Sequence, residues 1–217
     1  MKAFFARCGR FFADARRLLV FCYAAFFALS LLAALYSFAE DRVQRALGNV
    51  TTQQVTAADF DWTDLTAEGS ELVTASPDPR MILRSTPAYV RGVQIRVTFE
   101  NREPGEFCIF YKPRPDMEDF DANYRVWAHI EADGSYTFAL PRGRVYGLRL
   151  DPGIYTGIRM KIESITLNPR RSFAAYFAPT RPWLLAQAAL PALIASAVAC
   201  LQEAAAAGRR RGGEAAV

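Results

Sequence analysis

The chain has 217 residues, of which 52% are hydrophobic, and its formal net charge is +4. The first 17 residues contain five basic side chains and one acidic, whereas residues 40–171 contain 17 basic and 19 acidic side chains, a net charge of −2. Nucleic-acid-binding domains concentrate positive charge on the folded domain, so this distribution excludes nucleic acid as the expected partner.

Residues 1–17 form a basic arm, and residues 18–39 are a long apolar run that directly follows Arg16 and Arg17. A helix needs about 20 apolar residues to cross the hydrocarbon core of a bilayer. The run therefore predicts a first transmembrane helix. Ser37-Phe38-Ala39 resembles a signal-peptidase site, but secretory signals have apolar cores of about 7–15 residues. We interpret the run as an uncleaved anchor.

Residues 40–52 are expected to be a linker that continues the helix until Gly48-Asn49 ends it. After it, short runs of alternating or β-branched residues predict strands. The predicted strands are residues 71–75, 81–85, 90–99, 106–111, 125–130, 136–140, 145–150 and 158–167. Alternation is clearest over residues 93–99, and it shifts phase at Ser164-Ile165, which predicts a β-bulge.

Turn-forming residues separate the predicted strands. Asp133-Gly134 between two of them predicts a β-hairpin. Short strands without an amphipathic helix among them are typical of an antiparallel β-sandwich. We therefore predict an all-β, jelly-roll-like sandwich over residues 53–171, preferred to an immunoglobulin-like arrangement, with residues 112–124 as a long loop at one rim.

Residues 172–182 are a second linker, residues 183–201 a second apolar run, and residues 202–217 a tail. The second run is expected to form a helix that Pro191 kinks and that Gln187 joins to a neighbouring helix. Arg209, Arg210 and Arg211 follow it. Basic residues collect on the cytoplasmic side of membrane helices. Both termini are therefore expected in the cytoplasm and the sandwich outside it, in a cell membrane.

Five segments of the middle region carry a family resemblance. They are residues 78–83 (DPRMIL), 93–99 (VQIRVTF), 107–111 (FCIFY), 148–153 (LRLDPG) and 162–167 (IESITL). The region resembles the extracytoplasmic, jelly-roll-like sandwiches of bacterial multi-span, glycosyltransferase-like proteins of cell-surface polysaccharide assembly. The resemblance implies a cell-envelope glycan context, with a membrane glycosyltransferase or transporter as a partner. It implies no transferase activity, since this chain has two predicted spans.

Residues for catalysis are sparse. His129 is the only histidine, and no Ser-containing elbow, HExxH or Gly-rich phosphate loop accompanies it. Of the four cysteines, Cys8, Cys22 and Cys200 lie in the arm or the apolar runs. Cys108 alone lies in the middle region, which therefore has no disulfide framework. We expect Cys108 to be a small buried apolar residue and the protein to be no enzyme.

An acidic loop is the one candidate for a metal site. Its carboxylates are Asp116, Glu118, Asp119 and Asp121. Such oxygens can hold Ca²⁺, but the loop lacks the spacing of an EF-hand, and a solvated acidic loop is the competing interpretation. We predict no cofactor. Paired carboxylates that hydrolyse glycosidic bonds are a further alternative.

Aromatic and basic residues in or beside the strands are the candidates for ligand binding. They are Tyr111, Tyr124, Arg125, Trp127, Tyr146 and Arg149. Rings stack on sugar faces, and charged groups add hydrogen bonds. The competing interpretation is that these rings belong to the core.

The sequence therefore predicts a membrane-anchored, non-enzymatic accessory protein whose sandwich binds glycan or an assembly partner. Two alternatives stay open. One is an interaction subunit whose helices pack against a larger membrane complex, with the sandwich as a spacer. The other is a carboxylate-dependent glycan-modifying enzyme.

Overall fold

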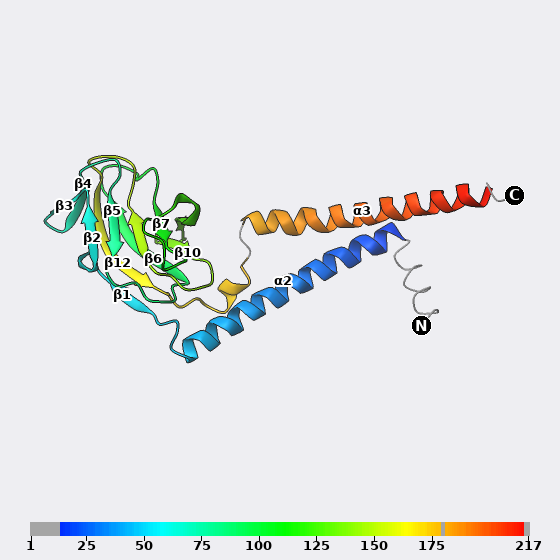
Figure 1. Ribbon diagram of the computed structural model, residues 1–217, viewed down its shortest axis with the longest axis horizontal. Coiled ribbons are helices and arrows are strands. Elements are labelled where there is room, and N and C mark those ends of the chain that lie inside the picture. Colours follow the sequence, from blue (N-terminus) through cyan, green and yellow to red (C-terminus); the bar gives the residue numbers. More distant parts are fainter. Residues whose placement is uncertain (1–13, 179–180, 215–217) are drawn as a thin grey trace. The chain divides into compact units, whose positions relative to one another are not determined.

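The computed structural model describes residues 14–178 and 181–214 (Figure 1). The chain divides into two compact units. One comprises the described parts of Met1–Glu40 and Arg171–Val217, and the other is Asp41–Arg170.

The first unit is helical. Helix α2 (Ala15–Ala46) and helix α3 (Arg181–Glu214) both extend beyond the predicted apolar runs, and the last six residues of α2 belong to the second unit. By length and composition, Ala15–Ala46 and Trp183–Ala205 could each cross a membrane. Tyr23 donates a hydrogen bond to the carbonyl oxygen of Ala188 at 2.6 Å, and the rings of Phe26 and Trp183 lie 5.6 Å apart. The two helices therefore pack together.

The second unit is an antiparallel β-sandwich, as predicted (Figure 1). The seven-stranded sheet contains β1 (Gln53–Val55), β3 (Leu65–Glu68), β4 (Glu71–Thr74), β6 (Gly92–Phe99), β9 (His129–Ile130), β10 (Tyr136–Ala139) and β12 (Arg159–Leu167). The five-stranded sheet contains β2 (Phe60–Thr63), β5 (Arg80–Leu83), β7 (Cys108–Tyr111), β8 (Arg125–Trp127) and β11 (Leu148–Asp151). Short 3₁₀ helices are η1 (Ala57–Asp59), η2 (Ala122–Tyr124) and η3 (Ala174–Tyr176).

Strand order identifies the topology. The sheets contain the runs β4-β12-β6-β10 and β5-β11-β7-β8, so that consecutive strands repeatedly change sheet. Two Greek keys shared between two sheets are the arrangement of a jelly roll. The hairpin at Asp133-Gly134 is present between β9 and β10, and the β-bulge is present as a register shift between Ile162 and Ser164.

Two strand predictions were wrong. Strands β1, β2 and β3 were missed because they are only three or four residues long and mostly exposed. The predicted strand over residues 125–130 is divided between the two sheets, β8 in one and β9 in the other. Ala128 lies between them, where its N–H binds the carbonyl oxygen of Phe107. Trp127 and His129 therefore lie in different sheets. A single strand over residues 125–130 would have placed both side chains on one face.

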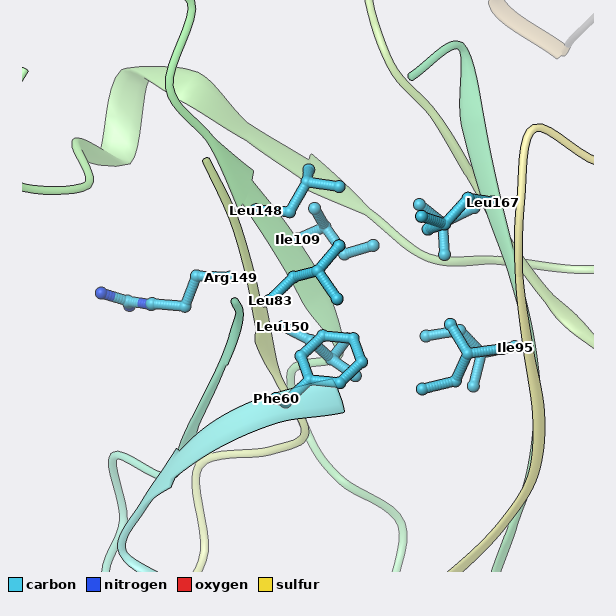
Figure 2. A pocket seen from close by; sticks show the side chains of 10 residues that line it. Phe60, Leu83, Ile95, Ile109, Leu148, Arg149, Leu150 and Leu167 are labelled. Carbon is cyan, nitrogen blue, oxygen red and sulfur yellow. The ribbon is translucent and has the colours of Figure 1, made fainter. Parts of the chain in front are cut away.

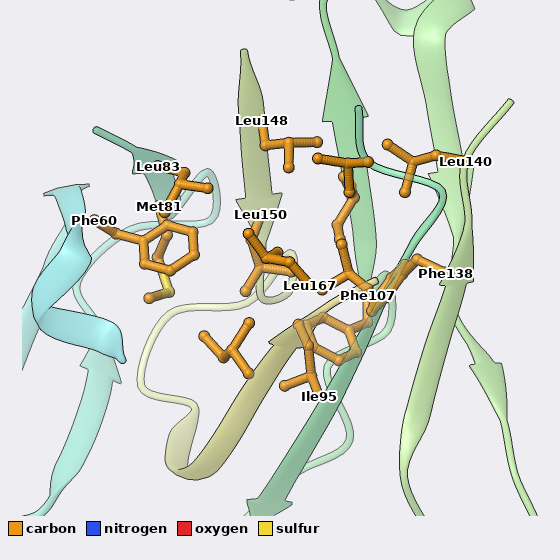
Figure 3. Packing of buried hydrophobic residues seen from close by; sticks show 14 of the residues in the cluster. Phe60, Met81, Leu83, Ile95, Phe107, Phe138, Leu140, Leu148, Leu150 and Leu167 are labelled. Carbon is orange, nitrogen blue, oxygen red and sulfur yellow. The ribbon is translucent and has the colours of Figure 1, made fainter. Parts of the chain in front are cut away.

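The core lies between the two sheets, where side chains of alternate strand residues meet (Figure 3). Met81, Ile95 and Phe138 are essentially inaccessible to solvent. Phe107 packs edge-to-face against Phe138, with ring centroids 5.3 Å apart. Such aromatic pairs stabilise a core beyond their area of burial by about 0.5–1.5 kcal/mol. The core contacts thus fix which side chains point outward from each sheet.

Candidate functional site

The outer face of the five-stranded sheet carries the largest share of the predicted binding residues. In its register Arg149 of β11 lies beside Phe110 of β7, which lies beside Arg125 of β8. Two residues further along these strands, Cys108 of β7 lies between Asp151 of β11 and Trp127 of β8. These positions alternate with the core positions of the same strands. Figure 2 shows Arg149 pointing away from the side of the sheet that carries Leu148 and Leu150.

Arg149 and Asp151 form a half-buried ion pair at the centre of this face. The guanidinium donates two hydrogen bonds to the carboxylate, at 2.7 and 2.5 Å, and the two side chains are only 13% and 14% exposed. The guanidinium also lies 4.2 Å from the ring centre of Phe110. Burial raises the pKa of Asp151, because the loss of water outweighs the hydrogen bonds from Arg149. Two hydrogen bonds and the Phe110 ring thus hold the pair within the face.

Trp127 is the exposed aromatic residue of this face. The residue is 48% exposed, and the Arg125 guanidinium lies 4.1 Å from the centre of its ring. Arg125 also approaches the Glu106 carboxylate, at 3.5 Å. A guanidinium over an aromatic ring is attracted by the electrons of the ring face. Arg125 thus orients the Trp127 ring and occupies one of its two faces.

The predicted tyrosines lie elsewhere. Tyr111 packs against the core, and its ring contacts that of Tyr124 at 5.8 Å between centroids. The competing interpretation of Tyr111 as a core residue is therefore the better one. Tyr146 is 43% exposed and shares the Arg144 guanidinium with Tyr89, at 5.9 Å from each ring centre. Of the six predicted binding residues, the face brings together Arg125, Trp127 and Arg149.

Several polar groups of the acidic loop have partners within the loop. Asp121 caps η2 by accepting a hydrogen bond from the N–H of Asn123 at 2.8 Å, and Asp116 lies 3.8 Å from Arg114. The carbonyl oxygen of Glu118 accepts a hydrogen bond from Lys112. Within residues 14–178 and 181–214, no three His, Cys, Asp or Glu side chains group so as to hold a metal ion. The calcium interpretation, which included Asp119, gains no support.

A second exposed tryptophan was missed by the sequence reasoning. Trp62 lines an open hollow of about 490 Å³ together with Ala58, Phe60, Asp61 and Arg84. Its indole N–H donates to the Ala57 carbonyl oxygen at 2.8 Å, and Arg84 binds Asp61 at 2.7 Å. Its strand, β2, is only four residues long, so its alternation was too brief to read.

An enclosed cavity between the sheets is not a site. Its volume is about 10 Å³, and its accessible lining is apolar (Figure 2). To hold one water molecule, a cavity needs about 10–15 Å³ of free volume and also polar groups that can bind the water. The space is therefore a small packing gap in the core.

No protein-family model matches the chain, and no curated protein matches it. Among solved structures, a low-affinity xylan-binding module, CBM86, from Roseburia intestinalis is 13% identical with a TM-score of 0.39, over 58% of this chain and 98% of that one. CsCBM6-3 from Clostridium stercorarium, in complex with cellobiose, is 9% identical with a TM-score of 0.30, over 56% of this chain and 95% of that one.

A third similar structure is a salicylyl-acyltransferase, SsfX3, from a tetracycline biosynthetic pathway. It is 12% identical with a TM-score of 0.33, over 55% of this chain and 40% of that one. We take no functional conclusion from the three similarities, because their TM-scores are all below 0.5.

Proposed function

We propose that this protein is a membrane-anchored, non-enzymatic glycan-binding module of the cell envelope. The observation that carries the proposal is the half-exposed Trp127 ring, held by the Arg125 guanidinium on the outer face of the five-stranded sheet.

The chemistry of this face suits a sugar. The C–H groups of a pyranose ring pack on an aromatic face, and the Arg125 guanidinium and the Glu106 carboxylate lie close enough to bind its hydroxyl groups. The Arg149–Asp151 pair and Phe110 form a fixed floor beside the ring. A rigid floor lowers the entropy lost when a ligand binds. The carboxylates of this face, Glu106 and Asp151, each pair with an arginine.

Anchoring is supported by the surface of the helical unit. Large apolar side chains on both helices are exposed, including Val20 at 68%, Leu185 at 73% and Leu201 at 71%. Many exposed large apolar side chains along two long helices are typical of a membrane or protein interface. We propose that lipid covers it, with both termini in the cytoplasm because Arg16 and Arg17 border the first apolar run.

A role without catalysis is supported by the placement of the groups that react most readily. His129 lies exposed on strand β9 of the seven-stranded sheet, whereas Cys108 is buried in the five-stranded sheet. A nucleophile and its base must lie within hydrogen-bonding distance. These two residues cannot form such a pair.

The experiment is a binding titration of the full chain in nanodiscs with cello-, xylo-, chito- and galacturonate oligosaccharides. Where an oligosaccharide binds, Trp127→Ala should raise its Kd about tenfold or more, a loss of about 1.4 kcal/mol. Ile130→Ala, at a site 61% exposed on the other sheet, is the matched control and should leave the Kd unchanged.

Two outcomes contradict the proposal. An unchanged Kd in Trp127→Ala with a raised Kd in Trp62→Ala would move the site to the Trp62 hollow. Absence of binding to every oligosaccharide would favour the interaction subunit instead, with the sandwich as a spacer.

A further inference from the structure

Three connections at one end of the β-sandwich are basic. The connections at residues 84–91, 140–147 and 168–170 contain five arginines and no Asp or Glu. Hydrogen bonds join them: the N–H of Leu140 binds the carbonyl oxygen of Arg91, and that of Val145 binds the carbonyl oxygen of Ala88. Connections of other strands are acidic, since residues 100–106 contain three Glu and one Arg. The 112–124 connection lies at the same end and carries four carboxylates beside Lys112 and Arg114, so the positive charge belongs to the three basic connections and not to the whole end.

Arginine and tyrosine side chains gather on two of these basic loops. Arg144 lies between the rings of Tyr89 and Tyr146, 5.9 Å from the centre of each. Val145, which lies between Arg144 and Tyr146 in the sequence, is buried and fixes the loop to the core. Arg142 and Arg144 are exposed. We define Tyr89, Arg142, Arg144 and Tyr146 as the basic rim.

The basic rim lies at the end of the sandwich where the chain enters and leaves. The side-chain amide of Asn168 donates to the carbonyl oxygen of Tyr89 at 2.9 Å and to that of Thr51, in the entering segment, at 3.1 Å. Arg45, near the end of α2, donates to the carbonyl oxygens of Asn168 and Pro169 at 3.3 and 3.2 Å. Hydrogen bonds thus connect the rim loop to both segments that lead to the helices.

The chain length between Ala39 and Arg45 limits how far this end can lie from the first predicted span. Helix α2 is continuous, and Arg45 comes six residues, or about 9 Å, after Ala39, the last residue of the first apolar run. The headgroup layer of each leaflet extends about 5–7 Å beyond the hydrocarbon. If the apolar run spans the bilayer, Arg45 and its partners are within reach of that layer.

We propose that the basic rim binds the phosphate groups of anionic phospholipids at the bilayer surface. This inference rests on the membrane anchoring in the proposed function. Guanidinium groups bind phosphate oxygens through paired hydrogen bonds, and tyrosine is enriched at membrane interfaces. The acidic loop lies beside the rim, since the N–H of Lys112 binds the carbonyl oxygen of Gly147 and the ring centre of Phe120 lies 4.8 Å from the Lys112 ammonium. Two of its four carboxylates are engaged within the loop, because Asp121 caps η2 and Asp116 faces Arg114.

The test is amide hydrogen exchange of the full chain in two kinds of nanodisc, phosphatidylcholine alone and phosphatidylcholine mixed with phosphatidylglycerol. We expect exchange in residues 84–91 and 140–147 to slow several-fold in the anionic discs and to recover at high salt, which screens the attraction. Exchange in residues 100–106 should be the same in both. Equal exchange of the rim loops in the two discs would overturn the inference.

A pair of variants tests the residues. The double change Arg142→Gln and Arg144→Gln should abolish the difference between the discs. Arg102→Gln is the matched control, since Arg102 lies 3.4 Å from the ring centre of Tyr155 on an acidic loop, and it should keep the difference. A double variant that retains the full difference would overturn the assignment to these arginines.

Two further experiments distinguish lipid phosphate from free phosphate, and the basic rim from the membrane anchoring on which it depends. Slowed exchange on adding inorganic phosphate to phosphatidylcholine discs would overturn the lipid headgroup as the ligand. Failure of the chain to float with vesicles would contradict the membrane anchoring itself. Flotation without headgroup-dependent exchange would overturn the basic rim alone.

Discussion

Asn168 shows how one residue holds the entrance and exit of the sandwich together. Its φ of 52° lies in the left-handed region, which Asn tolerates better than most residues, and the residue is 1% exposed. Its amide oxygen accepts from the N–H of Arg91 at 2.6 Å, and its amide nitrogen donates to two carbonyl oxygens. Nothing in the sequence around Pro169 indicates this role, because the partners of the Asn168 side chain come from two distant segments, one at Thr51 and one at residues 89–91.

Asn168→Ala should lower the free energy of unfolding by about 3 kcal/mol or more, since three buried hydrogen bonds are lost and Ala is strained at positive φ. Asn168→Gly relieves the strain and should lose about 1 kcal/mol less. Asn101→Ala is the control, because its two hydrogen bonds are exposed. Denaturant unfolding of the full chain in micelles measures all three. Equal losses for Asn168→Ala and Asn101→Ala would contradict this account.

Cys108 gives a prediction that depends on pH. Burial raises the pKa of its thiol to about 12, above an ordinary value near 9. The unfolded chain therefore releases this proton first, and the free energy of unfolding falls as pH rises from about 9 toward 12. Cys108→Ala should show a smaller fall over that range, in unfolding curves recorded at several pH values. An identical fall in both proteins would show that Cys108 contributes nothing to it.

At the scale of elements, the sequence predicts the turns between neighbouring strands but not which of the two sheets each strand joins. The β9–β10 hairpin follows from Asp133-Gly134, because the turn is set by neighbouring residues, and Gly134 has a φ of 80°. The change of sheet at Ala128 depends on a hydrogen bond to Phe107, about twenty residues away in the chain. A hydrogen bond between residues so far apart in the chain produces no periodic pattern in the sequence around either of them.

Gly134 and Gly153 allow the energetic cost of backbone strain to be compared with the cost of a steric clash. A Cβ at Gly153 would lie 2.6 Å from the Ile158 side chain and 2.9 Å from the carbonyl oxygen of Pro104, whereas one at Gly134 would meet nothing within 4 Å. Both residues have positive φ. Gly134→Ala should thus cost about 1 kcal/mol of strain, and Gly153→Ala about 3 kcal/mol or more. Thermal unfolding compares them, and similar losses would contradict the packing of these loops.

At the scale of the whole molecule, the architecture was more predictable than the site. The sandwich was foreseeable because short alternating strands and turn residues recur along residues 71–167. Which rings share a face was not, since Tyr111 and Trp127 come from neighbouring strands yet lie on the core side and the outer side of one sheet. The Trp62 hollow was missed because its strand is too short to show a pattern.

The basic ends and the two apolar runs gave the membrane prediction, and the structure adds two helices of sufficient length. Their packing through Tyr23 and Phe26 gives a helix pair that can carry the sandwich. The orientation across the membrane stays a prediction from charge. The proposed glycan-binding role depends on the outer face of the five-stranded sheet, and in particular on the Trp127 ring.

The most direct test uses that ring as its own reporter. The chain has three tryptophans, so Trp62→Phe with Trp183→Phe leaves Trp127 as the only one. We predict that an oligosaccharide which binds this variant in nanodiscs shifts the Trp127 emission to shorter wavelength, because the sugar removes water from the ring. The midpoint of the shift should match the Kd measured by calorimetry. Binding by calorimetry with an unchanged Trp127 emission would contradict the proposed site.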